Sequence, residues 1–183
     1  WGPYKGFIQN NSLNYETWPL LPPNGNDSHP YFAKEEFESK LGELCSKQDK
    51  VMVWLNDPAH NPTGLTMTPD GRRAALDIMM ASASRHPGIG HTLLLDVAYS
   101  LYADEPHGWG ETIVETMEDG TPWPENFLIT YAISMSKSHT AYGLRTGALM
   151  AIHPDAHVTE RLRGILGVTG RQTWSAAPRL LQH

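Results

Sequence analysis

Four short runs of apolar residues predict the strands of a β-sheet. They occupy residues 51–55, 92–95, 127–133 and 147–152. The first two runs are continuously apolar, which is typical of strands whose sheet is covered on both faces. Residues 12–20 form a further stretch that we expect to be extended, and residues 21–30 form a loop rich in Pro, Gly and Asn.

Segments with helical spacing of apolar residues separate the strands. The predicted helices cover residues 32–47, residues 68 to about 86, residues 110–120 and a segment after Pro154. The second helix has a clear start, because Thr68 is a capping hydroxyl, Pro69 suits the first helical position and Asp70 places an acid in the first turn. The alternation of strand and helix predicts an α/β fold with right-handed crossovers and a parallel sheet.

Polar residues follow three of these strands where each one ends. Asn61 lies in a turn after the first strand, Asp96 directly follows the second, and Lys137 lies just beyond the third. Ligands bind at the carboxyl ends of strands in open α/β sheets. The sequence therefore predicts a functional site at this edge.

Lys137 carries the strongest chemical signal in the sequence. A lysine amine forms a Schiff base with an aldehyde and also acts as a base. The hydroxyls of Ser134 and Ser136 precede it, and Arg145 follows it. Hydroxyl donors and a forked guanidinium match the oxygens of a phosphate. This segment therefore suits a carbonyl cofactor that also carries a phosphate.

Four motifs in a fixed order give a resemblance to a known family. They are Asn61-Pro62-Thr63-Gly64, Asp96-Val97-Ala98-Tyr99, Ser134-Met135-Ser136-Lys137 and Gly143-Leu144-Arg145-Thr146-Gly147. This pattern resembles the fold-type I pyridoxal-phosphate enzymes, specifically class I/II aminotransferases of the aspartate and aromatic type. The resemblance implies a three-layer α/β/α large domain with a mostly parallel sheet. Residues 1–183 would be an incomplete, central part of that domain, with an N-terminal segment and a C-terminal small domain outside this chain.

The resemblance also implies a role for each residue around the cofactor, pyridoxal 5'-phosphate. Lys137 would hold it as a Schiff base and move the substrate proton. Asp96 would face the pyridine nitrogen and keep it protonated, so that the ring can accept electrons. Asn61 and Tyr99 would reach the phenolic oxygen, and Trp1 would stack on the ring. Ser134, Ser136 and Arg145 would hold the phosphate.

Arg171 is a candidate for substrate binding. In the resembling family an arginine four residues before a Ser-Asn-Pro-Pro stretch binds the distal substrate carboxylate across the subunit interface. Here Ser175 is present, but Ala176 and Ala177 replace the Asn and the first Pro. Specificity for dicarboxylates therefore stays open, and so does the alternative that Arg171 is an arginine at a helix end.

The resemblance favours an enzyme that transfers an amino group between an amino acid and a 2-oxo acid, as a homodimer when complete. One alternative is a lyase or decarboxylase with the same fold and cofactor. Another is a catalytically incomplete fragment, and we expect the chain alone to be inactive. The Ser-x-x-Lys of serine β-lactamases is a weak rival, because Ser-Asp-Asn and Lys-Thr-Gly do not occur in the sequence.

Composition and charge limit which partners, locations and metal sites fit the sequence. A net charge of −6 and a pI near 5.8 argue against nucleic acid as a partner. No apolar run approaches the length needed to span a membrane. Cys45 is the single cysteine, so no internal disulfide can form, and we expect a reducing, cytoplasmic location. His153 and His157 lack a third ligand nearby, so no metal is expected.

Overall fold

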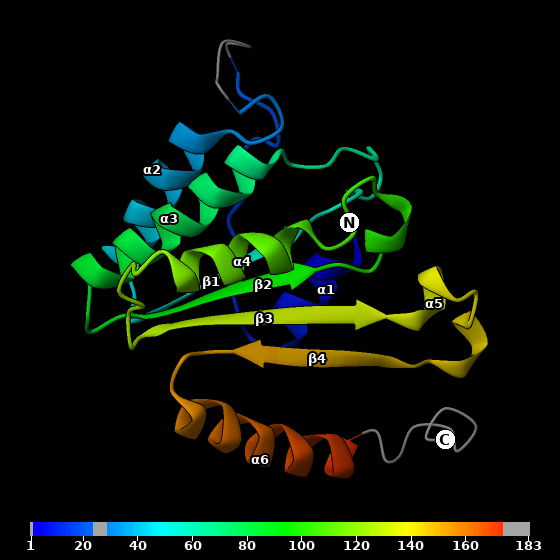
Figure 1. Cartoon of the computed structure of the whole chain (residues 1–183). Coiled ribbons are helices and arrows are strands. Elements are labelled where there is room, and N and C mark those ends of the chain that lie inside the picture. The colour runs from blue at the N-terminus through cyan, green and yellow to red at the C-terminus, as the bar shows by residue number, and fades with distance from the viewer. Residues whose placement is uncertain (1, 24–28, 174–183) are drawn as a thin grey trace.

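A four-stranded sheet is the centre of the fold (Figure 1). The computed structural model describes residues 2–23 and 29–173. The strands are β1 Lys50–Asn56, β2 Gly90–Asp96, β3 Phe127–Ser134 and β4 Gly147–Ile152, and they lie side by side in this order. All four predicted strands are therefore confirmed, each within two residues of its expected ends.

The direction of β4 differs from the expected parallel arrangement. β1, β2 and β3 are parallel, whereas β4 runs antiparallel to β3. The connection holds only the four-residue helix α5 Met135–Ser138 and the 3-10 turn η2 Tyr142–Leu144. The connection begins and ends beside the carboxyl end of β3, since Ser134 pairs with Gly147, and β4 therefore runs back along β3. With three parallel strands and one antiparallel strand, the sheet is mostly parallel.

Helices line one face of the sheet closely. α2 Lys34–Cys45, α3 Pro69–Arg85 and α4 Gly108–Glu118 form this layer (Figure 1). α6 Ala156–Thr173 lies beside β4. The predicted helices are thus confirmed with shifted ends. No helix in the described ranges is long and apolar enough to cross a membrane.

The opposite face of the sheet is covered in part within the described residues. Burial alternates along β1 and β2, as side chains point to either face in turn. On the open face Met52 is 61% exposed. There, Tyr4 of α1 Pro3–Asn10 packs on Trp54, with ring centroids 4.2 Å apart. The sequence did not predict α1, and residues 13–19 after it adopt no regular secondary structure.

α3 begins as its sequence predicts. The Thr68 hydroxyl accepts a hydrogen bond from Gly71 N at 3.1 Å, and Pro69 opens the helix. The helix packs against the sheet through fully buried side chains, among them Leu76 and Met79. Burying each such side chain contributes roughly 1.5–3 kcal/mol. This packing holds β1 and β2 in place and so fixes where the loops at their carboxyl ends begin.

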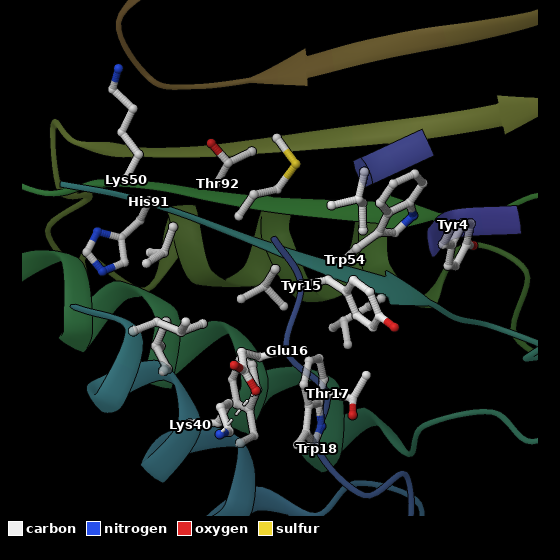
Figure 2. A pocket seen from close by; sticks show the side chains of 18 of the residues that line it. Tyr4, Tyr15, Glu16, Thr17, Trp18, Lys40, Lys50, Trp54, His91 and Thr92 are labelled. Carbon is white, nitrogen blue, oxygen red and sulfur yellow. Dashed lines mark ion pairs between the residues drawn. The ribbon is translucent and has the colours of Figure 1, made fainter. Parts of the chain in front are cut away.

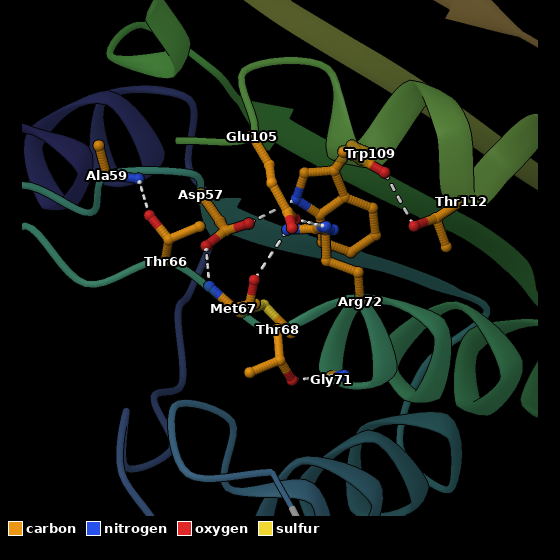
Figure 3. Close-up of polar contacts among 11 residues, drawn as sticks. Asp57, Ala59, Thr66, Met67, Thr68, Gly71, Arg72, Glu105, Trp109 and Thr112 are labelled. Atoms are coloured by element: carbon orange, nitrogen blue, oxygen red, sulfur yellow. Dashed lines mark hydrogen bonds and ion pairs between the residues drawn. The ribbon is translucent and has the colours of Figure 1, made fainter. Parts of the chain in front are cut away.

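A buried polar network ties the loop after β1 to the start of α4 (Figure 3). Arg72 is 2% exposed, donates to Met67 O at 2.8 Å and pairs with Glu105. Asp57 accepts hydrogen bonds from Met67 N at 2.8 Å and from Trp109 Nε1 at 2.7 Å. Burial raises the pKa of Asp57, while these donors and Arg72 oppose the rise. The network closes the loop 57–67, which carries Asn61.

Gly108→Ala is expected to destabilise the protein by about 2 kcal/mol through overpacking. A Cβ at Gly108 would lie 2.4 Å from Arg72 Nη2, and Arg72 is buried and held on two sides, so it cannot move aside easily. The matched control is Gly110→Ala in the same helix, where no atom lies within 4 Å of the added Cβ. Thermal and denaturant unfolding of both variants would test this, and equal stability would contradict it.

Candidate active site

The fold brings the three predicted strand-end residues to one edge of the sheet. β1, β2 and β3 are adjacent and parallel, so their carboxyl ends lie together. Asp96 is the last residue of β2 and pairs in register with Asn56 of β1. Asn61 follows β1 in the loop, and Lys137 lies in α5 directly after β3. The three residues therefore share one edge, as the strand order predicts, and binding of a ligand there stays a prediction.

Two donors from different parts of the chain hold the Asp96 carboxylate. The Tyr4 hydroxyl donates to Oδ2, and Ala98 N donates to Oδ1 at 3.1 Å. Burial and the neighbouring charge of Asp96 raise the pKa of Tyr4, so its hydroxyl stays protonated and able to donate. Within residues 2–23 and 29–173 no cation pairs with Asp96. The half-buried carboxylate therefore remains available for a cationic ligand.

Asn56 links the loops after β1 and β2. Its amide nitrogen donates to Asp96 O at 3.1 Å, and its amide oxygen accepts from Asn61 N at 2.7 Å. The Asn61 amide in turn donates to the Tyr99 hydroxyl at 3.4 Å. Asn61 and Tyr99 thus meet, as expected of two groups that would share one ligand atom. Asn56 was missed as a site residue, although a polar side chain ending an apolar strand was a usable signal.

Lys137 presents its amine to aromatic rings. Nζ lies 5.9 Å from the centre of the Tyr99 ring and 5.4 Å from that of Tyr142. The Tyr102 hydroxyl donates to Lys137 O at 2.7 Å and fixes the backbone. In the described part of the chain no carboxylate forms an ion pair with Lys137. The sequence had not indicated Tyr102 or Tyr142.

Arg145 and the two serines gather next to Lys137. The Ser134 hydroxyl caps α5 by accepting from Ser136 N at 3.2 Å. Arg145 Nη1 lies 3.5 Å from Ser136 Oγ and 3.1 Å from Tyr142 O, and its backbone is left-handed with φ 51°. That conformation costs a residue with a Cβ about 1–2 kcal/mol. Gly147 allows the close return of β4, because a Cβ there would lie 2.5 Å from Ile133 O.

Two predicted site residues cannot be placed. Trp1 lies outside the described residues. Arg171 falls in the last turn of α6, but its side chain is not among those described. Stacking by Trp1 and carboxylate binding by Arg171 therefore stay predictions.

A separate groove of about 1750 Å³ follows β1 (Figure 2). It is bounded by the segment 13–18, which crosses the sheet edge and is tied to α2 by the Lys40–Glu16 ion pair at 3.7 Å. Tyr4 and Trp54 line its far end, but Lys137, Asp96 and Tyr99 do not line it. Chemistry-bearing residues are thus at the strand ends rather than in this groove.

Comparison with known proteins agrees with the motif pattern. A family model described as aminotransferase class I and II matches residues 1–182. The chain belongs to this family. Its fold is correspondingly close to that of an aminotransferase from Anaerococcus prevotii, with a TM-score of 0.83 and 25% identity over 97% of this chain and 41% of that one.

Curated relatives give the same family. An aromatic-amino-acid aminotransferase from Paracoccus denitrificans is 32% identical over 155 residues, covering 82% of this aminotransferase-family chain and 36% of the relative. A cytoplasmic aspartate aminotransferase from Schizosaccharomyces pombe is 26% identical over 159 residues, covering 83% and 35%. The chain therefore spans about a third of the length of these relatives.

A further solved structure shares the fold. It is an aromatic-amino-acid aminotransferase from Burkholderia pseudomallei covalently bound to pyridoxal phosphate, with a TM-score of 0.68 and 20% identity. The match covers 97% of this chain and 40% of the Burkholderia pseudomallei chain.

Proposed function

We propose that the complete protein transfers an amino group between an amino acid and a 2-oxo acid, with pyridoxal phosphate as its cofactor. The observation that carries the proposal is the Lys137 amine, which lacks a carboxylate partner among the described residues and shares one edge with the Asp96 carboxylate. Named relatives that act on aspartate or aromatic amino acids support it.

The residues at this edge fit the cofactor by their chemistry. When bound, pyridoxal phosphate supplies an aldehyde for an amine and a ring that accepts electrons. Asp96, which pairs with no described cation, would face the protonated ring nitrogen. Asn61 and Tyr99 would donate to the phenolic oxygen from adjoining positions. The Arg145 guanidinium and the hydroxyls of Ser134 and Ser136 would hold the phosphate, and Trp1 would stack on the ring.

Lys137 and Asp96 would act on two different protons. Lys137 would anchor the cofactor and then, as a free amine, take the proton from the α-carbon of the substrate. An amine acts as a base only when neutral, and no carboxylate in the part of the chain that the structure describes forms an ion pair with Lys137. Asp96 would keep a proton on the ring nitrogen, because a charged oxygen at that position favours the protonated ring.

The rest of the site is proposed for the complete protein. Residues 1–183 would be the central part of a large domain in a cytoplasmic homodimer, and Arg171 would bind a substrate carboxylate. Residues 1–183 by themselves would not turn over substrate, because the relatives they match are more than twice as long. A lyase or decarboxylase would use the same cofactor residues and is the alternative reaction.

A half-reaction separates the two activities. The complete protein, loaded with cofactor, is mixed with aspartate or an aromatic amino acid, and the absorbance of the bound cofactor is followed. An aminotransferase gives a stable absorbance change that a 2-oxo acid reverses. A change that no 2-oxo acid reverses, with release of ammonia or carbon dioxide, would identify the lyase or decarboxylase instead.

Tyr4→Phe is expected to lower kcat/KM of the complete protein about tenfold, because Asp96 loses one of its two donors, worth about 1.5 kcal/mol. The absorbance of the bound cofactor should also shift, because the carboxylate that faces the ring nitrogen has lost a hydrogen-bond donor. The control is Tyr31→Phe, which removes a hydroxyl from a tyrosine that is 40% exposed. Unchanged kinetics and spectrum in Tyr4→Phe would contradict a role for Tyr4 beside Asp96.

A further inference from the structure

A cluster of potential metal ligands lies at the opposite end of the sheet from Lys137. Cys45 ends α2, His91 is the second residue of β2, and His86 caps the carboxyl end of α3. One ligand atom from each of the three lies within 4.8 Å of the others. His91 and Asp96 are five strand residues apart, roughly 16 Å. The cluster is therefore separate from the proposed active site.

The His91 ring is oriented as a metal-binding imidazole would be. It lies on the helix side of the sheet, away from Thr92 (Figure 2), and is 1% exposed. Its Nδ1 is 2.9 Å from Ile89 O, a contact that requires Nδ1 to carry the hydrogen. Nε2 then presents its lone pair to Cys45 Sγ at 3.4 Å and Ser82 Oγ at 3.0 Å. Such a carbonyl partner is the usual outer support of a ligating histidine.

The backbone around both histidines is held by one side chain. Asn126 Nδ2 lies 3.1 Å from Ala83 O, 3.1 Å from His86 O and 2.7 Å from Ile89 O. Ile89 N also donates to His86 O at 2.9 Å. The turn between α3 and β2 is therefore fixed before any ligand arrives, which lowers the entropy cost of binding.

We propose that Cys45, His86 and His91 bind a divalent cation of the zinc type. Thiolate and imidazole ligands suit this ion, with Zn–S near 2.3 Å and Zn–N near 2.05 Å, which places sulfur and nitrogen about 3.5 Å apart in a tetrahedron. The separation of Cys45 Sγ and His91 Nε2 is 3.4 Å. His86 is half-buried at a helix end, and its Nδ1 lies 3.0 Å from Ser82 O, a contact that requires Nδ1 to carry the hydrogen and leaves Nε2 as the ligand atom.

Binding of the ion would release one proton from the site. The Cys45 thiol releases its hydrogen to solvent as the thiolate coordinates, and the histidines bind as neutral rings. Ser82 Oγ, 3.6 Å from Cys45 Sγ, or a water would take the fourth position. The ion would join the ends of α2, α3 and β2. Spacing in the sequence did not reveal this site, because Cys45 and His91 are 46 positions apart.

Cobalt titration of the complete, cofactor-loaded protein tests the proposal. After removal of metals with a chelator, Co²⁺ is added and difference spectra are recorded against the cobalt-free protein. We expect one equivalent to give a thiolate-to-cobalt charge-transfer band and the strong d–d bands of a tetrahedral site. Zn²⁺ should displace the cobalt, and Tm should rise with Zn²⁺ concentration because the ion binds only the folded state.

Two ligand variants and one control test the site. Cys45→Ser should lose the charge-transfer band, and His86→Gln should bind at least about tenfold more weakly. His86 is half-buried, so we expect His86→Gln to fold, and it tests the site even if Cys45→Ser does not fold. His157→Gln, in exposed α6, is the control and should bind like the unchanged protein. Absence of the thiolate band from the unchanged protein, or unweakened binding by His86→Gln, would overturn the proposal and leave a purely hydrogen-bonded cluster.

Discussion

Replacing Lys137 with alanine is expected to lower amino-group transfer by the complete protein by roughly 10⁴-fold or more, because one change removes both the covalent anchor and the general base. Among residues 2–23 and 29–173, no second lysine contacts this position. The cation nearest in the chain, Arg145, stacks on Tyr142 and contacts Ser136, and a guanidinium does not deprotonate in proteins. Rates would be measured at saturating cofactor, so that weaker binding does not contribute.

Chemical labelling gives an independent measure of the same assignment. Borohydride reduction of the cofactor-loaded protein, followed by peptide mapping, should place the label on Lys137. Lys50→Ala is the matched control, since Lys50 is an exposed lysine at the start of β1 and should be dispensable for activity. A label on Lys50 or on any lysine other than Lys137 would rule out the assignment.

Local patterns predicted much of this fold. The strands at residues 51–55 and 92–95 could be predicted because a run of apolar residues between polar loops can be recognised from a few consecutive residues. α3 begins at Pro69 because its cap is encoded in three consecutive residues. The common edge of Asn61, Asp96 and Lys137 followed from strand order alone, because parallel strands end on the same side.

Contacts between distant parts of the chain were not predictable in the same way. Tyr4 is 92 positions from Asp96, and nothing in the local sequence of either residue indicates the other. The antiparallel direction of β4 follows from the compact path of the segment 135–146, which begins and ends at the same end of β3, and not from the composition of β4. α1 was missed because Gly6 and several polar residues weaken its helical pattern. Tertiary packing supplied these features.

Asp96→Asn is expected to lower kcat/KM of the complete protein by about 10²–10³-fold, or roughly 3–4 kcal/mol, the range for losing one fixed electrostatic partner. Asparagine has nearly the shape of aspartate, so the cofactor should still bind. It lacks the charge that would keep the ring nitrogen protonated. Its amide group also meets two donors, Tyr4 and Ala98, with only one acceptor oxygen, so Tyr4 must turn its hydroxyl away or accept instead.

Combining this change with Tyr4→Phe tests how the two residues act. If Tyr4 serves the reaction only by holding the Asp96 carboxylate, Tyr4→Phe should cost about tenfold in the unchanged protein and almost nothing when Asp96 is already asparagine. Asp104→Asn, an exposed acid in the loop after β2, is the control and should keep full activity. Near-normal turnover of Asp96→Asn with the cofactor bound would show that Asp96 is not the partner of the ring nitrogen. If the losses in kcat/KM were instead additive in the double variant, Tyr4 would have a role independent of Asp96. Two residues that act through the same carboxylate cannot each lose the full contribution of that carboxylate.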